Sequence, residues 1–387
     1  VFRANAAFHA DETAPATSNH IVHLVPSPDQ SDILTYHKAD VPEPSGPTMD
    51  LTATNIVIAT GAKPRPLPGN PFAGALIDST QALEVNEFPS SAVIIGAGAI
   101  ALEFASMWNA AGSKVTLLIR KDRVLSAWDR RAGTTLTREL KRHGVNIITR
   151  ASVTHVDTGA NLGATVHYTC EGQDGEQSVW GEIALVAIGR DPITDPAWGV
   201  TIDDHGHVAT DAYGRTDKPG VWAVGDVTAG HALAHRAFEQ GIVIAETIAG
   251  LNPKPVDEAT VPQIVFSFPE AASVGLTVEQ AQAREDLIEI KETNYPMLAN
   301  ARMLMSGTAG SLTIVSGCDA ANPDTPRVLG VHMVSQMASD IIAEAEQLVG
   351  NHVPLADAAR LVHPHPTFSE TLGEALLKAD GRPLHTR

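Results

Sequence analysis

A histidine and a glutamate near the C-terminus have the spacing of an acid–base pair. His365 and Glu370 stand five residues apart, and an imidazole oriented by a carboxylate is a common general base. Pro366 favours an extended start, and Ser369 is available to cap a following helix. A metal site using His363 and His365 is the competing hypothesis, and it lacks further ligands at metal-like spacing. The pattern predicts acid–base chemistry and no metal ligands.

A glycine-rich turn forms a second candidate site. A dinucleotide-binding turn requires glycine first for a tight bend, glycine next for approach to a pyrophosphate, and a small third residue for packing. Gly96, Gly98 and Ala101 meet these requirements. The turn follows an expected buried strand, Ala92–Ile95, and opens an expected helix, Ile100–Ala111, whose free N–H groups favour phosphate. The alternative is a turn used only for packing.

The strand expected at Lys114–Ile119 completes a βαβ unit, and its end bears on the choice of nucleotide. An acidic residue there would accept from a ribose 2′-OH, whereas basic residues would pair with a 2′-phosphate. Ile119 stands where an acid would be expected, and Arg120 and Lys121 follow. The pattern favours NADPH, and a solvated basic turn is the alternative.

A carboxylate marks the end of another expected strand. Val221–Val224 leads directly into Gly225 and Asp226, which places the Asp226 side chain at the edge of a sheet where ligands bind. There it could accept from a sugar or ribityl hydroxyl. An aspartate that merely caps a helix or turn is an equally good explanation.

The bulk composition limits the classes of function. A chain of 387 residues is too long for one core, so two or three domains are expected. A net charge of −18 argues against nucleic-acid binding and suggests a cytoplasmic protein. No apolar run is long enough for a membrane span. The two cysteines, Cys170 and Cys318, are too far apart for a local redox disulfide and are expected to be ordinary thiols.

The elements that would position these sites fall into four segments. Residues 1–70 contain expected strands at Ile21–Val25, Ile33–Tyr36 and a buried Ile56–Ile58, and end in a proline-rich linker. Residues 71–190 form the nucleotide-binding unit, which is inserted into the first domain. Residues 191–258 return to that domain and contain an expected helix at Leu233–Ala249, and residues 259–387 alternate strands and helices as an α+β domain.

Five motifs, in this order, resemble the pyridine nucleotide–disulfide oxidoreductases, which include dihydrolipoyl dehydrogenase, glutathione reductase and mercuric reductase. They are ATG at Ala59–Gly61, GAGAIALE at Gly96–Glu103, AIGR at Ala187–Arg190, VGD at Val224–Asp226 and HPTFSE at His365–Glu370. Gly230–Gly241, Phe266–Thr277 and His363–Ala375 look like dihydrolipoyl dehydrogenase, whereas Leu118–Leu125 looks more like glutathione reductase.

The resemblance implies an α/β fold with two Rossmann-like domains, for FAD and NAD(P), the first incomplete, and a C-terminal α+β dimerisation domain. It places Glu103 near the nicotinamide, Asp226 on the FAD ribityl chain, and the backbone of Ala234 and His235 against the flavin. His365, oriented by Glu370, would serve the active site of the partner subunit in a homodimer formed from about residue 260. The full implied cofactor set is Thr60, Gly61, Gly96, Gly98, Ile100, Glu103, Arg120, Lys121, Gly189, Arg190, Gly225, Asp226, Ala234 and His235.

The family's first GxGxxG and its CxxxxC redox disulfide do not occur in these residues, and we expect the chain to be an N-terminally truncated member of the family. We therefore expect the FAD-side sheet to expose apolar surface, and the chain as given to be inactive in dithiol chemistry. The implied function is oxidation of dihydrolipoamide by NAD⁺ through FAD. An NADPH-dependent disulfide reductase and a non-catalytic dimeric NAD(P)-binding module are the alternatives, and the second would leave His365 and Glu370 without a purpose.

Overall fold

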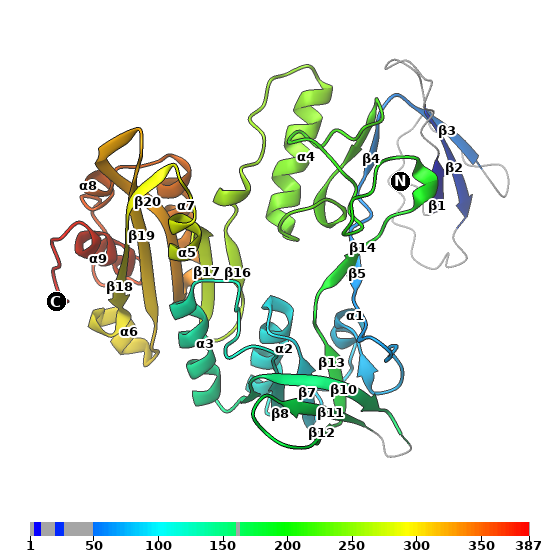
Figure 1. The fold of residues 1–387 in the computed structure, drawn as a ribbon, viewed down its shortest axis with the longest axis horizontal. Coiled ribbons are helices and arrows are strands. Elements are labelled where there is room, and N and C mark those ends of the chain that lie inside the picture. Colours follow the sequence, from blue (N-terminus) through cyan, green and yellow to red (C-terminus); the bar gives the residue numbers. More distant parts are fainter. Residues whose placement is uncertain (1–3, 9–19, 27–48, 160–162, 387) are drawn as a thin grey trace. The chain divides into compact units, whose positions relative to one another are not determined.

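The computed structural model describes residues 4–8, 20–26, 49–159 and 163–386 (Figure 1). The chain divides into two compact units, of which unit 1 comprises residues 1–63 and 190–258, and unit 2 comprises residues 64–189 and 259–387. The division into four segments that we expect from the sequence is finer than this division into two units, and it stays a prediction. The expected strand at Ile33–Tyr36 lies outside the described residues.

Unit 1 contains short sheets and one long helix. Three antiparallel strands form a sheet in the order β1-β2-β3, β4 pairs in parallel with β15, and β5 pairs with β14. The long helix α4 follows β15 along the chain. The bounds are β1 Ala4–Phe8, β2 His20–Pro26, β3 Met49–Ala53, β4 Ile56–Ile58, β5 Ala62–Pro64, β14 Arg190–Pro192, β15 Val221–Ala223 and α4 Ala234–Ile248.

The strand β4 is less buried than the sequence predicted for Ile56–Ile58. Ile58 is buried, but 45% of Val57 is exposed, because within the described residues β4 pairs with β15 alone. The helix α4 likewise leaves Phe238 and Ile242 exposed, at 71% and 52%. Apolar surface therefore lies open in unit 1, as the sequence predicted.

The first half of unit 2 contains a parallel sheet covered on both faces. Its strand order is β6-β13-β7-β8-β9. Ile94 and Leu117 pack with Leu102 of α2 on one face, whereas Val93 and Leu118 pack with β10 and β11 on the other. The bounds are β6 Leu76–Ile77, α1 Ser79–Leu83, β7 Ser91–Ile95, α2 Ala99–Ala110, β8 Lys114–Leu118, α3 Arg130–Arg142, β9 Asn146–Ile148, β10 Ala151–Asp157, β11 Ala164–Cys170, β12 Gln177–Gly181 and β13 Ile183–Val186.

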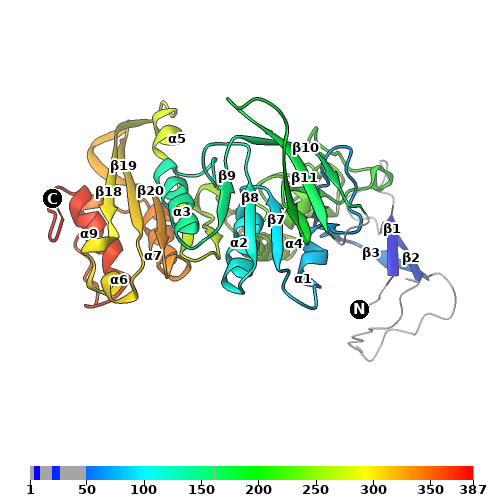
Figure 2. The same ribbon diagram turned by 90° about the horizontal axis from the view of Figure 1, so that it is seen from below.

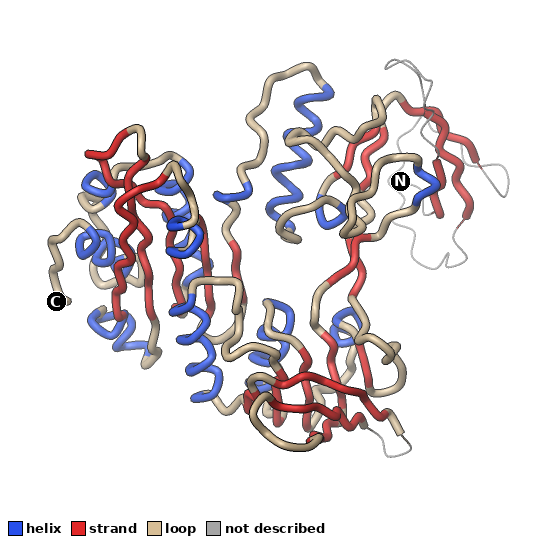
Figure 3. Tube along the Cα trace, viewed as in Figure 1, coloured by secondary structure: helices blue, strands red, loops and turns tan. Residues whose placement is uncertain are grey.

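The second half of unit 2 is an antiparallel sheet with helices packed against it (Figures 2 and 3). Its strand order is β16-β17-β20-β19-β18, and α7, α8 and α9 share an apolar core with β19 and β20. The bounds are β16 Gln263–Val265, β17 Glu270–Gly275, α5 Val278–Gln282, β18 Leu287–Pro296, α6 Ala301–Ser306, β19 Ser311–Asp319, β20 Asn322–Ser335, α7 Ala338–Gly350, α8 Leu355–Ala358 and α9 Glu370–Ala379. Among the described residues, none of the helices combines the length and apolarity that crossing a bilayer requires.

Candidate active site

The glycine turn joins β7 to α2 at the carboxyl edge of the parallel sheet. Gly96 has a φ of +145°, and a Cβ added there would lie 2.2 Å from the carbonyl oxygen of Ala187. The same Cβ would lie 3.3 Å from the methyl group of Ala101, which is completely buried. Both the backbone angle and the crowding therefore require glycine at position 96.

The second glycine has a different environment. Gly98 is exposed, is the N-cap of α2, and has nothing within 4 Å of an added Cβ. No side chain caps the helix N-terminus at this position. No N-cap side chain therefore bonds the N–H groups at the start of α2, near the half-buried Ile100, and the space beside Gly98 is open. This geometry is compatible with the predicted pyrophosphate site, which stays a prediction.

Glu103 lies one turn along the same helix and is partly buried. The backbone N–H of Phe266 donates a 3.0 Å hydrogen bond to its carboxylate, and the N–H of Phe268 donates to Ser106 at 2.8 Å. Burial raises the pKa of the Glu103 carboxyl, and the Phe266 hydrogen bond partly offsets this. These bonds hold the connection between β16 and β17 against α2.

The end of β8 is basic at the surface and apolar beneath it. Ile119 is 1% exposed, whereas Arg120 and Lys121 are both exposed. No carboxylate stands at the position of Ile119 to accept from a ribose hydroxyl. The basic side chains of Arg120 and Lys121 are of the kind that pairs with a phosphate instead.

Four further predicted residues lie where the chain passes to and from the nucleotide-binding segment. Thr60 donates a 2.6 Å hydrogen bond to the carbonyl of Ile193, whose N–H donates to Gly61 at 2.9 Å. Arg190 donates to the carbonyl of Ala62. The structure thus brings Thr60, Gly61 and Arg190 together in unit 1. Gly189 belongs to unit 2, where its carbonyl accepts from Arg65 at 3.1 Å.

The Gly-Asp turn of unit 1 follows β15 as expected. Gly225 is buried with a φ of +76°, and its N–H donates to Gln240 of α4 at 2.9 Å. The carboxylate of Asp226 is half-buried in the short turn that follows. Ala234 and His235 are exposed at the start of α4. The turn is therefore fastened to the middle of α4 through the side chain of Gln240.

The C-terminal pair has the geometry expected from its spacing. His365 Nδ1 donates to Glu370 Oε1 at 2.8 Å, and the N–H of Thr367 donates to the other carboxylate oxygen at 2.9 Å. The Glu370 side chain is 15% exposed, whereas His365 is 68% exposed. The carboxylate is thus fixed by the backbone, and the outer nitrogen of the imidazole remains accessible. The predicted capping role of Ser369 is wrong, because its side chain makes no capping hydrogen bond and Thr367 bonds the Glu370 N–H instead.

The neighbouring histidine makes a separate contact. His363 Nε2 lies 2.9 Å from Glu344 of α7, and this hydrogen bond raises the pKa of the His363 imidazole. His363 and His365 are therefore each bonded to a different carboxylate. This arrangement does not favour the competing hypothesis of a shared metal ion.

The cysteines lie in different sheets. Cys170 ends β11 and Cys318 lies in β19, and both are buried free thiols. Burial raises the pKa of the Cys318 thiol, which makes it a poor nucleophile at neutral pH. Neither thiol can pair with the other as a redox disulfide.

Comparisons of the sequence with family profiles and with individual proteins find members of one family. Residues 19–241 match the profile described as pyridine nucleotide-disulphide oxidoreductase, and residues 261–376 match the dimerisation domain of the same proteins. The chain is 38% identical to dihydrolipoyl dehydrogenase of Cupriavidus necator and 36% identical to that of Bacillus subtilis. Each alignment covers 87% of this chain and 70% of the relative. The chain belongs to the pyridine nucleotide–disulphide oxidoreductase family.

Solved structures of family members have the same fold. LpdA from Mycobacterium tuberculosis has a TM-score of 0.80 at 26% identity, covering 96% of this chain and 76% of that one. The HOCl-induced flavoprotein disulfide reductase RclA from Escherichia coli has a TM-score of 0.75 at 26% identity, covering 85% of this chain and 74% of that one.

Membership in the pyridine nucleotide–disulphide oxidoreductases decides several predictions. The family consists of FAD-dependent flavoproteins that act on sulfur groups with NAD(P). The predicted fold class, enzyme class, cofactors and likeness to dihydrolipoyl dehydrogenase are confirmed. The C-terminal residues form the family's dimerisation domain. The roles of individual site residues stay predictions.

One buried arginine in the flavin half had not been expected. Arg236 is 3% exposed, and it bonds to Glu258 and to the carbonyl of Ala229. An added Cβ at Gly230 would clash with its guanidinium. Arg236 therefore fixes the loop before α4. Its burial is not visible in the sequence, because its carboxylate partner, Glu258, lies 22 residues away.

Proposed function

We propose that this protein oxidises dihydrolipoamide to lipoamide, with FAD and a nicotinamide nucleotide, as a homodimer in the cytoplasm. The observation that carries the proposal is the His365–Glu370 pair, with its 2.8 Å hydrogen bond and accessible outer nitrogen. A dithiol must lose two protons as well as two electrons when it becomes a disulfide. An oriented imidazole at the surface of a dimerisation domain is the group that can take the first proton.

The two residues have distinct roles. His365 Nε2 accepts a proton from a substrate thiol, which creates the thiolate that reacts. Glu370 accepts from Nδ1–H, so it selects the tautomer with a free Nε2 lone pair and stabilises the imidazolium that forms. The backbone N–H of Thr367 keeps the Glu370 carboxylate in place during this change of charge. In a homodimer, this pair serves the site of the partner subunit.

The cofactor residues divide between the two units. In unit 2, Gly96, Gly98 and Ile100 approach the NAD(P) pyrophosphate, and Glu103 lies toward the nicotinamide. In unit 1, Asp226 accepts from the FAD ribityl chain, and the start of α4 faces the flavin. Thr60, Gly61 and Arg190 of unit 1 and Gly189 of unit 2 would hold the backbone of the two connections to the nucleotide-binding segment. Bound FAD supplies the transfer of an electron pair between the dithiol and the nicotinamide.

The thiol relay requires a close pair of cysteines, which these 387 residues do not contain. The chain's own two thiols lie in different sheets and are buried. We therefore expect no turnover from the 387-residue protein by itself, and rapid oxidation of dihydrolipoamide by it would contradict this expectation.

An NADPH-dependent disulfide reductase is the second candidate. The exposed Arg120 and Lys121, beside a buried Ile119, favour it, because they suit a 2′-phosphate. The same flavin and acid–base pair would then work in the opposite direction, with electrons passing from NADPH to a disulfide.

A kinetic experiment on the product of the complete gene tests the proposal. Dihydrolipoamide oxidation with NAD⁺ or NADP⁺ is compared between the wild type and His365→Gln. Loss of the acid–base group should lower kcat about 10²–10⁴-fold and remove the corresponding pKa from the pH profile. His363→Gln is the matched control, and it should retain most of the activity. Equal rates for wild type and His365→Gln would overturn the proposal, and preference for a disulfide with NADPH would favour the second candidate.

A further inference from the structure

Two histidines face each other across neighbouring strands in the nucleotide-binding half of unit 2. His155 of β10 and His167 of β11 are direct cross-strand partners. A bulge between Val153 and His155 shifts the alternation of β10, so that Thr154 and His155 are both exposed. In a regular strand through Val153, Thr154 and His155, the alternation of side chains would place His155 on the same side as Val153, toward the core. The bulge thus turns His155 to the outer face, where His167 already lies.

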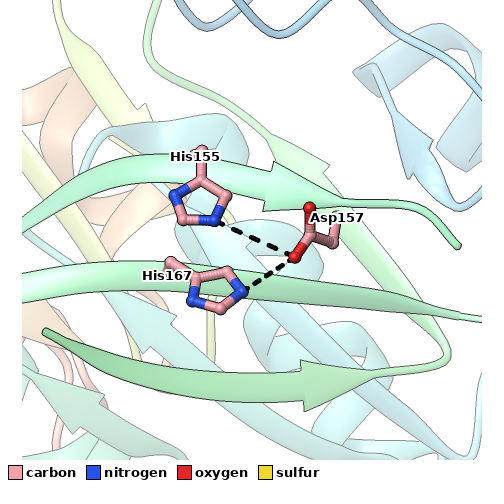
Figure 4. A group of neighbouring side chains, drawn as sticks. All are labelled: His155, Asp157 and His167. Atoms are coloured by element: carbon pink, nitrogen blue, oxygen red, sulfur yellow. Dashed lines mark hydrogen bonds and ion pairs between the residues drawn. The ribbon is translucent and has the colours of Figure 1, made fainter.

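The two imidazoles converge on one carboxylate (Figure 4). Their rings are stacked, with centroids 4.0 Å apart and an interplanar angle of 9°. Asp157 lies two residues beyond His155 on the same face of the sheet. Its Oδ2 atom is 3.1 Å from His167 Nε2 and 3.8 Å from His155 Nε2. Three potential ligand atoms, one from each residue, all lie within 4.8 Å of one another.

A second carboxylate lies at the opposite edge of both rings. Glu176 Oε2 is 3.6 Å from His167 Nδ1, and Glu176 Oε1 is 3.8 Å from His155 Nδ1. Thr154 donates a 2.7 Å hydrogen bond to Glu176 and so fixes its position. A carboxylate behind a metal-binding histidine accepts its Nδ1–H and leaves the Nε2 lone pair directed at the ion.

We propose that His155, His167 and Asp157 bind a divalent transition-metal ion such as Zn²⁺, with Glu176 as the outer carboxylate that orients the imidazoles. Two neutral nitrogens and one carboxylate oxygen are a donor set that Zn²⁺ accepts, with a water completing the tetrahedron. The donor atoms must move closer, because Zn²⁺ binds nitrogen and oxygen at about 2.0–2.2 Å. The exposed side chains of His155 and Asp157 leave room for the rings to tilt toward the ion.

The sheet explains what such an ion would do. It would join β10 to β11 beside the bulge, where the ladder of backbone hydrogen bonds is interrupted. The opposite faces of these strands pack in the core beneath the parallel sheet, through Ala151 of β10 and through Val166 and Tyr168 of β11. The ion would therefore stabilise the folded nucleotide-binding half, independently of the chemistry proposed for His365.

Calorimetric titration of the untagged protein with Zn²⁺ tests this site. We expect saturable binding of one ion per chain and a Zn²⁺-dependent rise in Tm, because an ion that binds only the folded state stabilises it. The double variant H155N/H167N should lose both effects. Glu176→Gln should weaken Zn²⁺ binding about 10–100-fold, as expected for a residue that orients a ligand.

A matched control replaces two histidines that lie near an aspartate elsewhere in the chain, in a turn. His205 and His207 lie near Asp203, and H205N/H207N should leave the Zn²⁺ isotherm unchanged. Absence of saturable binding in the wild type would overturn the proposal. So would an isotherm that H155N/H167N leaves unchanged, because the ion would then bind elsewhere.

Discussion

The two nucleotide-binding sheets of this protein differ in how completely the chain covers them. In unit 2 the parallel strands are buried on both faces, by α2 and α3 on one and by β10 and β11 on the other. In unit 1 the strand β4 pairs with β15 alone among the described residues, and the apolar side chains of Val57 and Phe238 are exposed. Both sheets nevertheless present a glycine turn at the carboxyl end of a strand.

The difference separates two kinds of site. The glycine turn of unit 2 packs through Gly96 against Ala101 and the backbone of Ala187. The Gly225–Asp226 turn is fastened to α4, but on a sheet with much less surrounding core. We therefore expect nicotinamide nucleotide binding to be an autonomous property of the chain, and flavin binding to depend on further structure.

The largest expected effect concerns the two glycines of the NAD(P) turn. Gly96→Ala should destabilise unit 2 by at least about 2–3 kcal/mol, because it adds a backbone clash to an unfavourable φ. Gly98 has a backbone angle that alanine adopts readily, and an added Cβ would meet no atom of the chain, so Gly98→Ala should keep the wild-type Tm. The added methyl group would occupy the space where the pyrophosphate is proposed to bind, so the substitution should weaken nucleotide binding instead. Thermal unfolding and NADPH titration of both variants measure this contrast. Equal Tm values for the two variants would contradict the packing argument.

A second pair of substitutions compares the helices of the two units. Leu102→Ala on α2 removes a fully buried side chain and should cost about 2–5 kcal/mol. Phe238→Ser on α4 removes an exposed one and should change stability by less than about 0.5 kcal/mol. Chemical denaturation of each variant supplies the measurement. A large loss of stability from Phe238→Ser would show that the exposed surface of unit 1 is covered in solution.

The basic side chains after β8 give a smaller effect. If Arg120 and Lys121 hold a 2′-phosphate, R120S/K121S should weaken NADPH binding roughly tenfold or more and leave NADH binding nearly unchanged. Fluorescence titrations at two salt concentrations make the comparison, because charge pairing with phosphate weakens with salt. Equal losses for both nucleotides would make this turn a solvated basic surface.

Glu103 gives the smallest effect, through pH. Burial raises the pKa of the Glu103 carboxyl, so ionisation of this group opposes folding. The contribution of the protonated carboxyl to the free energy of unfolding is present below the unfolded-state pKa, and it is lost as pH rises through the folded-state pKa. Glu103→Gln should therefore become more stable relative to the wild type between about pH 4 and neutrality, with little difference below the unfolded value of about 4.3. Thermal unfolding across that range tests the sign, and a gap that narrows as pH rises would be wrong for this cause.

Local patterns predicted the parts of the site that depend on few residues. The glycine turn follows from three small residues between a strand and a helix, and the His365–Glu370 bond follows from spacing. The residues that escaped prediction depend on tertiary context. His155 joins His167 only because a bulge reverses its face, and Arg236 finds its carboxylate 22 residues away at Glu258. The expected burial of the strand Ile56–Ile58 was right for Ile58 and wrong for Val57, because an apolar strand pattern does not show how many strands pair with it.

The most direct test of the account is titration of the flavin-free 387-residue protein with NADPH and NADH, followed by nucleotide fluorescence. We expect saturable binding at one site per chain without FAD, retained in Phe238→Ser and weakened in Gly98→Ala. Binding that occurs only after FAD is added, or none at all, would contradict the claim that unit 2 forms a complete nicotinamide nucleotide site.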